Sequence, residues 1–276
     1  MTYLSVPNSL PSTSMPEYTL LIWARGAFPR RIVYQLLQKG LVTSPAALLA
    51  GETTHPNLTL NIQTMTITNG AFSDTQSNPS DPKPADKSTP CLRVRDGDTE
   101  SWIHESASIM MFVEDTFEGP NLASRNPLTR AQTWDLLGQI NLAMVDSMYY
   151  MRHATPVTQF WSGIDPNERS HPAARNARDT FHRGLVKLQT WAEPSLKSSG
   201  WLTPGVDGPG VVDFAVAGPA RYQWLGYELD SFEDERLGLL REWWAHFKTL
   251  SWWEEFEECK DNHPEGFSFP KEVREV

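Results

Sequence analysis

Cysteine is scarce in this chain of 276 residues: only Cys91 and Cys259 are present, too far apart for a CxxC motif. This scarcity excludes a disulfide framework and a zinc-ligand pattern, so we expect a cytoplasmic protein without a metal site. Cys91 follows a proline in a predicted strand. We therefore expect it to be a small buried hydrophobic residue.

Long hydrophobic runs are also missing, so no membrane-spanning helix is expected. The first residues, MTYLSVPNSLPSTSMPEY, contain neither a cationic region nor an apolar core, which predicts no export signal. Basic residues are few, with 24 Lys and Arg against 34 Asp and Glu and a formal net charge of -10. Such a chain repels nucleic acid and anionic membranes, so neither is an expected partner.

Proline and apolar residues are distributed in a way that favours two domains. Prolines cluster in the first ninety residues, whereas the second half consists of long helical stretches. We predict a flexible tail over residues 1–16, an α/β domain over 17–120, an all-helical domain over 125–262 and a second tail over 263–276.

The first half has the pattern βαβ followed by ββα. An apolar strand over 18–23 precedes a helix that starts near Pro29 and ends at Gly40, and a β-branched strand covers 58–67. Residues 68–89, rich in turn formers, predict a long mobile loop. A hairpin over 92–104, with Asp96-Gly97 at its turn, precedes a helix over 106–117.

The second half is predicted to be helical over 128–151, 172–195, 211–226 and 233–247. The acidic run EEFEE at 254–258 is interpreted as the solvated face of a helix. Asp213, early in the third of these helices and three residues after Gly210, is expected to cap it as a structural residue.

Three motifs fall in this order and carry a family resemblance: WARGAFPRRIVYQLLQKGL, TPCLRVRDGDTESWIHESASIMMFVED and GWLTPGVDGPGVVDFAVAG. Together they resemble fungal glutathione transferase-like proteins. The resemblance implies a thioredoxin-like N-terminal domain that holds glutathione and a helical C-terminal domain that shapes a pocket for a hydrophobic second substrate. It also implies a homodimer.

Glu105-Ser106 stands where such transferases hold the γ-glutamyl group. A helix N-terminus offers unpaired N–H groups to a carboxylate, the Ser106 hydroxyl adds a donor, and Glu105 can pair with the α-ammonium. The alternative is that Ser106 merely caps the helix. The resemblance adds His104 to the glutathione-binding residues.

Thr89-Pro90 matches the position of the family's cis-proline, whose preceding residue offers backbone hydrogen bonds to the cysteinyl part of glutathione. The alternative is an ordinary strand-initiating proline. We favour the cis form because Pro90 directly precedes the predicted hairpin.

The catalytic position departs from the family pattern. Family enzymes carry Tyr, Ser or Cys just after the first strand, but here Gly26 or Ala27 occupies that place. Because a nearby cation can stabilise a thiolate, Arg25 is the candidate for thiol activation. The alternative for Arg25 is a surface ion pair or a helix contact, and this is what we expect of Arg30 and Arg31.

The second-substrate pocket is expected between the first-strand loop and the first long helix of the second domain. Flexible and aromatic side chains at helical spacing can line an apolar cavity, although such stripes are more often core. The candidates are Trp23, Phe28, Asn141, Met144, Met148, Tyr149, Arg152, Tyr222 and Trp224.

The leading interpretation is conjugation of glutathione to a hydrophobic electrophile, in detoxification or secondary metabolism as the resemblance implies. Two alternatives stay open. One is a glutathione-dependent isomerase or related pocket catalyst, which product mass would distinguish. The other is a non-enzymatic glutathione-binding or regulatory protein that has kept the fold.

Overall fold

The computed structural model describes residues 15–68, 71–76, 78 and 80–259 of the chain. Most of the predicted N-terminal tail and the whole of the predicted C-terminal tail therefore lie outside the described residues.

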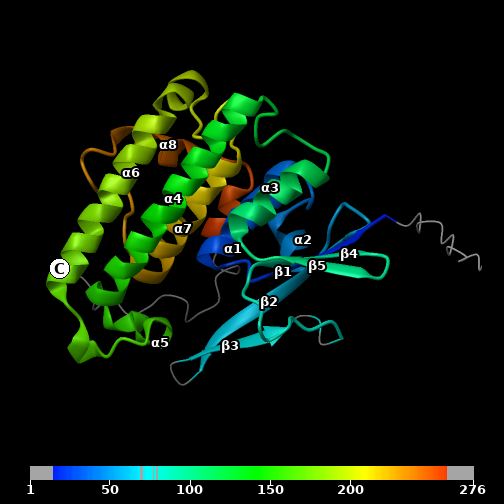
Figure 1. The fold of residues 1–276 in the computed structure, drawn as a ribbon, viewed down its shortest axis with the longest axis horizontal. Helices are drawn as coiled ribbons and strands as arrows, with labels where there is room; N and C mark the ends of the chain where they lie inside the picture. The colour runs from blue at the N-terminus through cyan, green and yellow to red at the C-terminus, as the bar shows by residue number, and fades with distance from the viewer. Residues whose placement is uncertain (1–14, 69–70, 77, 79, 260–276) are drawn as a thin grey trace, which may run out of the picture.

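The N-terminal half is built on one five-stranded sheet in the order β3-β2-β1-β4-β5 (Figure 1). Its strands are β1 (Glu17–Ile22), β2 (Leu58–Thr68), β3 (Ala71–Gln76), β4 (Cys91–Asp96) and β5 (Thr99–Ile103). Strand β1 is parallel to β2 and antiparallel to β4. The predicted strands and hairpin are confirmed, and Cys91 is buried as expected.

The predicted loop over 68–89 is wrong in part, because β3 lies within it and pairs antiparallel with β2. The sequence carries a signal for this hairpin: Thr68 pairs with Ala71, and the two residues between them are Asn-Gly. That dipeptide is a strong hairpin signal, but the polar composition of the following residues obscured it.

Helices α1 (Ala27–Lys39) and α3 (Ser106–Thr116) lie side by side between the sheet and the helical half, whereas the short α2 (Pro45–Leu49) precedes β2 (Figure 1). Gly40 ends α1 in the left-handed conformation, with φ of 74°. This conformation suits glycine because it has no Cβ. The predicted helix and its stop at Gly40 are confirmed.

The described part of the C-terminal half contains helices and connecting loops but no strand (Figure 1). Two long helices, α4 (Pro127–Ala154) and α6 (His171–Ser199), pack along each other, and α7 (Val211–Tyr227) packs against α1. Shorter elements are η1 (Pro156–Thr158), α5 (Gln159–Ser162), η2 (Pro166–Glu168), α8 (Gly238–Phe247) and η3 (Glu254–Glu258). The predicted class, α/β followed by all-α, is confirmed.

Helix α8 begins at Gly238, later than the predicted residue 233. The preceding residues form a turn in which the Arg236 N–H donates to Asp234 Oδ1 and the Leu237 N–H donates to the Asp234 carbonyl. This turn satisfies the Asp234 side chain locally, which competes with helix formation.

Asp213 caps α7 as predicted, and it is fully buried. Its carboxylate accepts from the N–H groups of Leu202, Thr203 and Gly210 and from the Thr203 hydroxyl and Trp243 Nε1. Because Gly210 has no side chain to cap the helix, Thr203 Oγ1 accepts from the Val212 N–H instead. A Cβ on Gly210 would lie 2.4 Å from the Leu122 carbonyl oxygen, which explains the glycine.

The predicted solvated face at EEFEE is wrong for Glu257, whose side chain is fully buried against α1 and α7. It accepts hydrogen bonds from Arg30, Tyr34 and Arg221. A buried carboxylate is tolerated only when it is paired and hydrogen-bonded. A sequence pattern shows the acidic run but not its partners.

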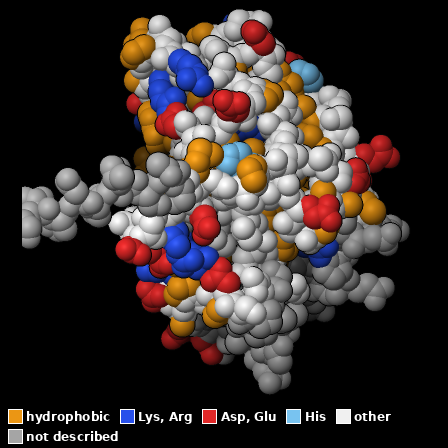
Figure 2. Space-filling view, turned by 90° about the vertical axis from the view of Figure 1, so that its right-hand side faces the viewer, with side chains coloured by type: hydrophobic (Ala, Val, Ile, Leu, Met, Phe, Trp, Pro, Cys, Tyr) orange, Lys and Arg blue, Asp and Glu red, His pale blue; other side chains and the backbone are white. Residues whose placement is uncertain are grey.

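Seen from the β5 side, acidic and basic side chains are interspersed on the surface (Figure 2). The acidic net charge is therefore not gathered into one patch on the face that Figure 2 shows.

None of the helices in the described part of the chain has both the length and the apolar character that a membrane crossing requires.

Candidate functional site

One cavity of about 370 Å³ lies where the hairpin meets α3, at the border with α4. All five residues predicted to bind glutathione line it: Thr89, Pro90, His104, Glu105 and Ser106. The Thr89-Pro90 bond is cis, as predicted. Residues far apart in the sequence thus meet at one place.

The N-terminus of α3 faces this cavity without a side-chain cap. Glu105 is the N-cap residue and makes no side-chain cap hydrogen bond, and Ser106 is the first helical residue. The Ser106 hydroxyl accepts from Arg31 Nη1 at 3.3 Å. Capping by Ser106, the alternative to a binding role, is therefore not what this side chain does.

Arg31 lines the same cavity, which corrects the expectation of a surface ion pair. It is only 1% exposed and lies over the Phe28 ring, with 5.0 Å between Cζ and the ring centroid. Its Nη1 also donates to Asn141 Oδ1 on α4 at 2.8 Å. The arginine is buried because α7 packs against α1, with Gly218 close to the Arg31 side chain, a packing that no local pattern reveals.

The charge of Arg31 is poorly matched by the protein. The other buried cations in the described part of the chain each contact a carboxylate: Arg30 and Arg221 contact Glu257, and Lys39 contacts Glu114. Arg31 instead contacts a hydroxyl and an amide, and its Nε and Nη2 have no partner among the described residues.

Burial lowers the pKa of Arg31 to about 9, against the opposing influence of the Glu105 charge. This direction follows from the cost of placing a cation away from water. An anion in the cavity would offset that cost. The site is thus electrostatically suited to an anionic ligand.

Arg25, the predicted activating cation, lines neither this cavity nor the apolar cavity next to it, which is described below. Its carbonyl accepts from Arg30 Nη1, and its guanidinium is half-buried. Burial, followed by the nearby charge of Arg30, lowers the pKa of Arg25 to about 10. The structure also corrects the surface role expected of Arg30, which is fully buried on Glu257.

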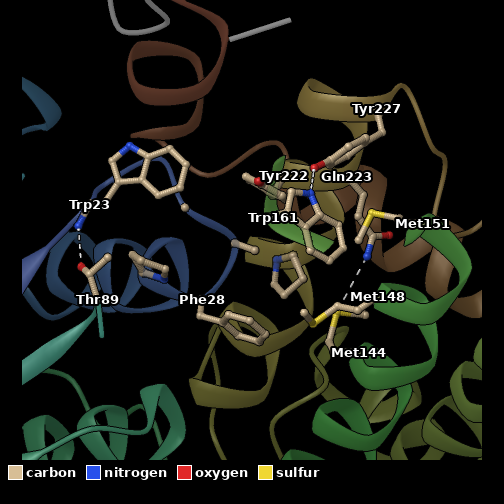
Figure 3. Close-up of a pocket in the computed structure, with 14 residues that line it drawn as sticks. Trp23, Phe28, Thr89, Met144, Met148, Met151, Trp161, Tyr222, Gln223 and Tyr227 are labelled. Carbon is tan, nitrogen blue, oxygen red and sulfur yellow. Dashed lines mark hydrogen bonds between the residues drawn. The ribbon is translucent and has the colours of Figure 1, made fainter. Parts of the chain in front are cut away.

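A second cavity, of about 240 Å³ and mostly apolar, adjoins the first through Phe28 and Thr89 (Figure 3). It lies between the loop after β1 and helices α4, α5 and α7. Of the predicted pocket residues, Trp23, Phe28, Met144 and Met148 line it, as does Tyr222. Asn141 lines the first cavity instead.

Three predicted pocket residues line neither cavity. Tyr149 is 51% exposed, because it lies about 100° around α4 from Met148. Arg152 stacks on the Tyr149 and Trp161 rings without lining either cavity. Trp224, 49% exposed, borders a different hollow with Arg221 and Lys248.

Sequence reasoning missed several lining residues: Met151, Trp161, Pro219, Gln223 and Tyr227. Met151 continues the spacing of Met144 and Met148 along α4, so its periodicity could have identified it. Trp161 lies on the short helix α5, which is too short to be predicted from a periodic pattern. The α7 residues face the cavity because α7 packs beside α4.

No family model matches the chain, and no curated protein matches it. Solved structures do match. A glutathione transferase family member from Pseudomonas fluorescens Pf-5, with bound S-(propanoic acid)-glutathione, is 16% identical with a TM-score of 0.58, covering 87% of this chain and 98% of that one.

Two further structures are similar. Maleylacetoacetate isomerase from Anaeromyxobacter dehalogenans 2CP-1, with bound dicarboxyethyl glutathione and citrate, is 16% identical with a TM-score of 0.54, covering 91% and 94% of the two chains. FzlA from C. crescentus is 18% identical with a TM-score of 0.53, covering 92% and 96%. The chain therefore has the glutathione transferase fold, with a thioredoxin-like domain followed by a helical domain.

Proposed function

We propose that this protein binds glutathione in the cavity at the α3 N-terminus and conjugates it, through its thiol sulfur, to a hydrophobic electrophile in the adjoining apolar cavity. The observation that carries the proposal is the buried Arg31, which lies beside the uncapped α3 N-terminus and has no carboxylate partner of its own among the described residues. Both features favour an anion. Glutathione carries two carboxylates and an ionisable thiol.

In this proposal the γ-glutamyl carboxylate lies on the α3 N-terminus and the Ser106 hydroxyl, and Glu105 pairs with the α-ammonium. Thr89, before the cis-proline, offers its backbone to the cysteinyl part. The thiol then points toward the apolar cavity, because Thr89 and Phe28 line both cavities. Proximity of the two reactants supplies much of the rate enhancement.

Gly26 and Ala27 carry no hydroxyl or thiol that could activate the thiol of glutathione. We propose that Arg31 stabilises the anionic form of the ligand, in place of the side chain that such transferases use. Arg25 is the competing candidate. A detoxification or secondary-metabolic role is part of the proposal, although the matched structures named above, from Pseudomonas, Anaeromyxobacter and C. crescentus, give no support to a fungal origin.

Glutathione-dependent isomerisation is a second candidate function, because the maleylacetoacetate isomerase structure is among the matches. It needs the same two cavities but consumes no glutathione. Mass spectrometry of the products distinguishes the two reactions: an adduct indicates conjugation, and a product of unchanged mass indicates isomerisation.

We further propose that the protein is a homodimer that pairs through the exposed face of α4. Leu142, Val145 and Tyr149 lie on this face at helical spacing with half or more of their surface exposed, and Val145 also lines the glutathione cavity. Sedimentation of the protein and of Leu142→Asp tests this, with Trp191→Asp on α6 as the control. A monomeric parent protein would contradict it.

Calorimetric titration with glutathione tests the central proposal. Ser106→Ala should weaken binding at least about tenfold, since a hydrogen bond to a charged group contributes ~1.5–3 kcal/mol and 1.4 kcal/mol is tenfold in Kd. The control is Ser108→Ala, which changes an exposed serine in the same helical turn that lines neither cavity. Cysteinylglycine lacks the γ-glutamyl group and should bind both variants equally. If the parent protein does not bind glutathione, the proposal is overturned.

A further inference from the structure

The loop between β1 and α1 forms part of the wall of the apolar cavity, with Trp23 at its start (Figure 3). Gly26 and Ala27 at its end also line the cavity, but neither has a polar side chain that could anchor it. A Cβ on Gly26 would lie 2.8 Å from Cε3 of Trp23 and 2.9 Å from Cγ of Pro29, so no larger residue fits there. This part of the loop is therefore held through its backbone.

Backbone hydrogen bonds hold the loop at its start, and a side chain from α1 holds it further along. The Trp23 N–H donates to Thr89 Oγ1 at 3.2 Å, which ties the start of the loop to the cis-proline segment. The Gly26 N–H donates to the Trp23 carbonyl at 3.0 Å and closes a turn. Between these residues, the Arg25 carbonyl accepts from Arg30 Nη1. The position of this carbonyl thus depends on an arginine side chain.

The Arg30 side chain is itself fixed. Its other two nitrogens, Nε and Nη2, donate to the two carboxylate oxygens of Glu257 at 2.6 Å and 3.1 Å, and its Cζ lies 5.9 Å from the centre of the Phe256 ring. Neither side chain of the ion pair is exposed to solvent. Charge-assisted bonds in such a dry environment are strong and leave the guanidinium little freedom to move. Arg30 therefore transmits the position of Glu257 to the loop.

Arg30 lines neither cavity, so it does not touch a ligand bound in either of them. It acts instead on the loop residues that do line the apolar cavity. If the loop shifted, Trp23 would move against Tyr222 of α7, because the two rings meet edge-on with centroids 6.4 Å apart. The shape of the cavity on this side therefore follows the position of the loop.

We propose that Arg30, anchored by Glu257, is a positioning residue that fixes the loop over residues 23–26 and thereby the shape of the second-substrate cavity; this rests on the proposed function. Glu257 then contributes to the reaction although it lines neither cavity. Such a contribution can be large, because a reactant misplaced by about 1 Å can react ~10²-fold more slowly.

Arg30→Lys separates the two tasks of the arginine. A lysine ammonium can still pair with Glu257, but it is a compact charge without the planar fork that reaches the Arg25 carbonyl at the same time. Tyr34→Phe is the matched control, because it removes another hydrogen bond to the buried Glu257 and leaves the Arg30 fork in place. Both variants weaken the cluster around Glu257, but only Arg30→Lys releases the loop.

Hydrogen exchange followed by mass spectrometry measures this release and needs no ligand. The amides of Gly26 and residue 30 are hydrogen-bonded within the segment, so a peptide over residues 23–30 reports on it. Relative to a peptide from the middle of α6, it should exchange at least about tenfold faster in Arg30→Lys, the effect of losing one hydrogen bond to a charged group. In Tyr34→Phe this ratio should change less than about twofold. The same ratio in both variants overturns the proposal.

Steady-state kinetics test whether the position of the loop matters to the reaction. With 1-chloro-2,4-dinitrobenzene as the electrophile, Arg30→Lys should lower kcat/KM for the electrophile at least about tenfold. The KM for glutathione should change less than about twofold. An unchanged kcat/KM, or an equal rise of both KM values, would overturn the positioning role.

Glu257→Gln approaches the anchor from the other end and carries the same test if Arg30→Lys does not fold. Its amide keeps one oxygen for Arg30 and replaces the other with an N–H₂ group that cannot accept a hydrogen bond. The fork is then held less firmly, so the peptide over residues 23–30 should exchange faster than it does in Tyr34→Phe. Equal exchange in these two variants would show that Glu257 does not anchor the loop.

The exchange measurement also keeps this proposal separate from the proposed function, because it depends on neither glutathione nor turnover. Faster exchange of the segment in Arg30→Lys supports the positioning role even if the parent protein binds no glutathione. If the parent protein binds glutathione and the segment does not respond to Arg30→Lys, only the positioning role is wrong.

Discussion

Arg30 on α1 and Glu257 in η3 form a two-pronged ion pair across 227 residues of sequence, with Nε to Oε1 at 2.6 Å and Nη2 to Oε2 at 3.1 Å. Both side chains are fully buried. Tyr34 and Arg221 complete the coordination of the carboxylate. The C-terminal segment thereby joins α1 of the first domain to α7 of the second.

Removing this carboxylate should strongly destabilise the fold. Glu257→Ala leaves Arg30 buried without its partner, and the loss of one member of a buried pair costs ~3–5 kcal/mol of unfolding free energy. Urea unfolding measures the loss. The matched control is Glu254→Ala, an exposed residue of the same segment, which should change stability by less than about 0.5 kcal/mol.

The same pair predicts acid sensitivity. Burial alone would raise the pKa of Glu257, but Arg30 and Arg221 hold it below its ordinary value of 4.5. The folded pKa is thus below the unfolded one, so the stabilisation is complete above about pH 4.5 and is lost as the pH falls through the folded pKa. Below that ordinary value the unfolded state binds more protons.

Glu257→Gln tests this sign. Urea unfolding of the parent protein and the variant at neutral pH and at about pH 4 gives the stability difference between them. The difference should be smaller at the lower pH, because the unfolded parent chain takes up a proton at Glu257 there before the folded protein does, which lowers the unfolding free energy of the parent. An unchanged difference would show that Glu257 does not titrate with unfolding.

The buried cap at Asp213 predicts a second large effect. Asp213→Asn turns an amide N–H₂ toward donors of Leu202, Thr203 or Trp243, leaving at least one buried donor without an acceptor. An unsatisfied buried group costs ~1–3 kcal/mol, and more when the lost partner was charged. Asp207→Asn, an exposed change in the preceding loop, is the control for urea unfolding. Equal stability of the two variants would contradict the capping role.

Much of the site was predictable because its signals are local. Thr89-Pro90 precedes a hairpin and Glu105-Ser106 follows it, so a few adjacent residues carry the pattern and its place in the fold. The Met144 and Met148 spacing likewise shows one face of a helix. These side chains reach the cavities because β4, β5, α3 and α4 bring them there.

The rest was not predictable because it depends on packing between the domains. Arg30 and Arg31 are adjacent charged residues with identical local signals, yet one meets Glu257 and the other lines the cavity. Tyr149 and Met148 are neighbours on α4, and only its rotation against α7 decides which one faces the pocket. Sequence periodicity does not fix that rotation.

The choice between Arg31 and Arg25 as the cation that serves glutathione is decided by matched substitutions. Arg31→Met removes the charge but keeps an apolar chain, so glutathione should bind about tenfold or more weakly, given ~1.5–3 kcal/mol for a hydrogen bond to a charged group. The pKa of the bound thiol should also rise; it is measured from the ultraviolet absorbance of the thiolate as the pH is varied. Arg25→Met should leave both quantities nearly unchanged, because Arg25 lines neither cavity; the reverse pattern would assign the role to Arg25.

Loss of charge must be separated from loss of packing, because Arg31 also joins the domains through Asn141. Asn141→Ala removes that hydrogen bond while the Arg31 charge stays beside Ser106 and the α3 N-terminus. If the charge matters, Asn141→Ala should keep the low pKa of the bound thiol and lose only stability, by ~1 kcal/mol in urea unfolding. If Asn141→Ala raises the thiol pKa as much as Arg31→Met does, the arginine acts by holding the domains together, and the electrostatic role is wrong.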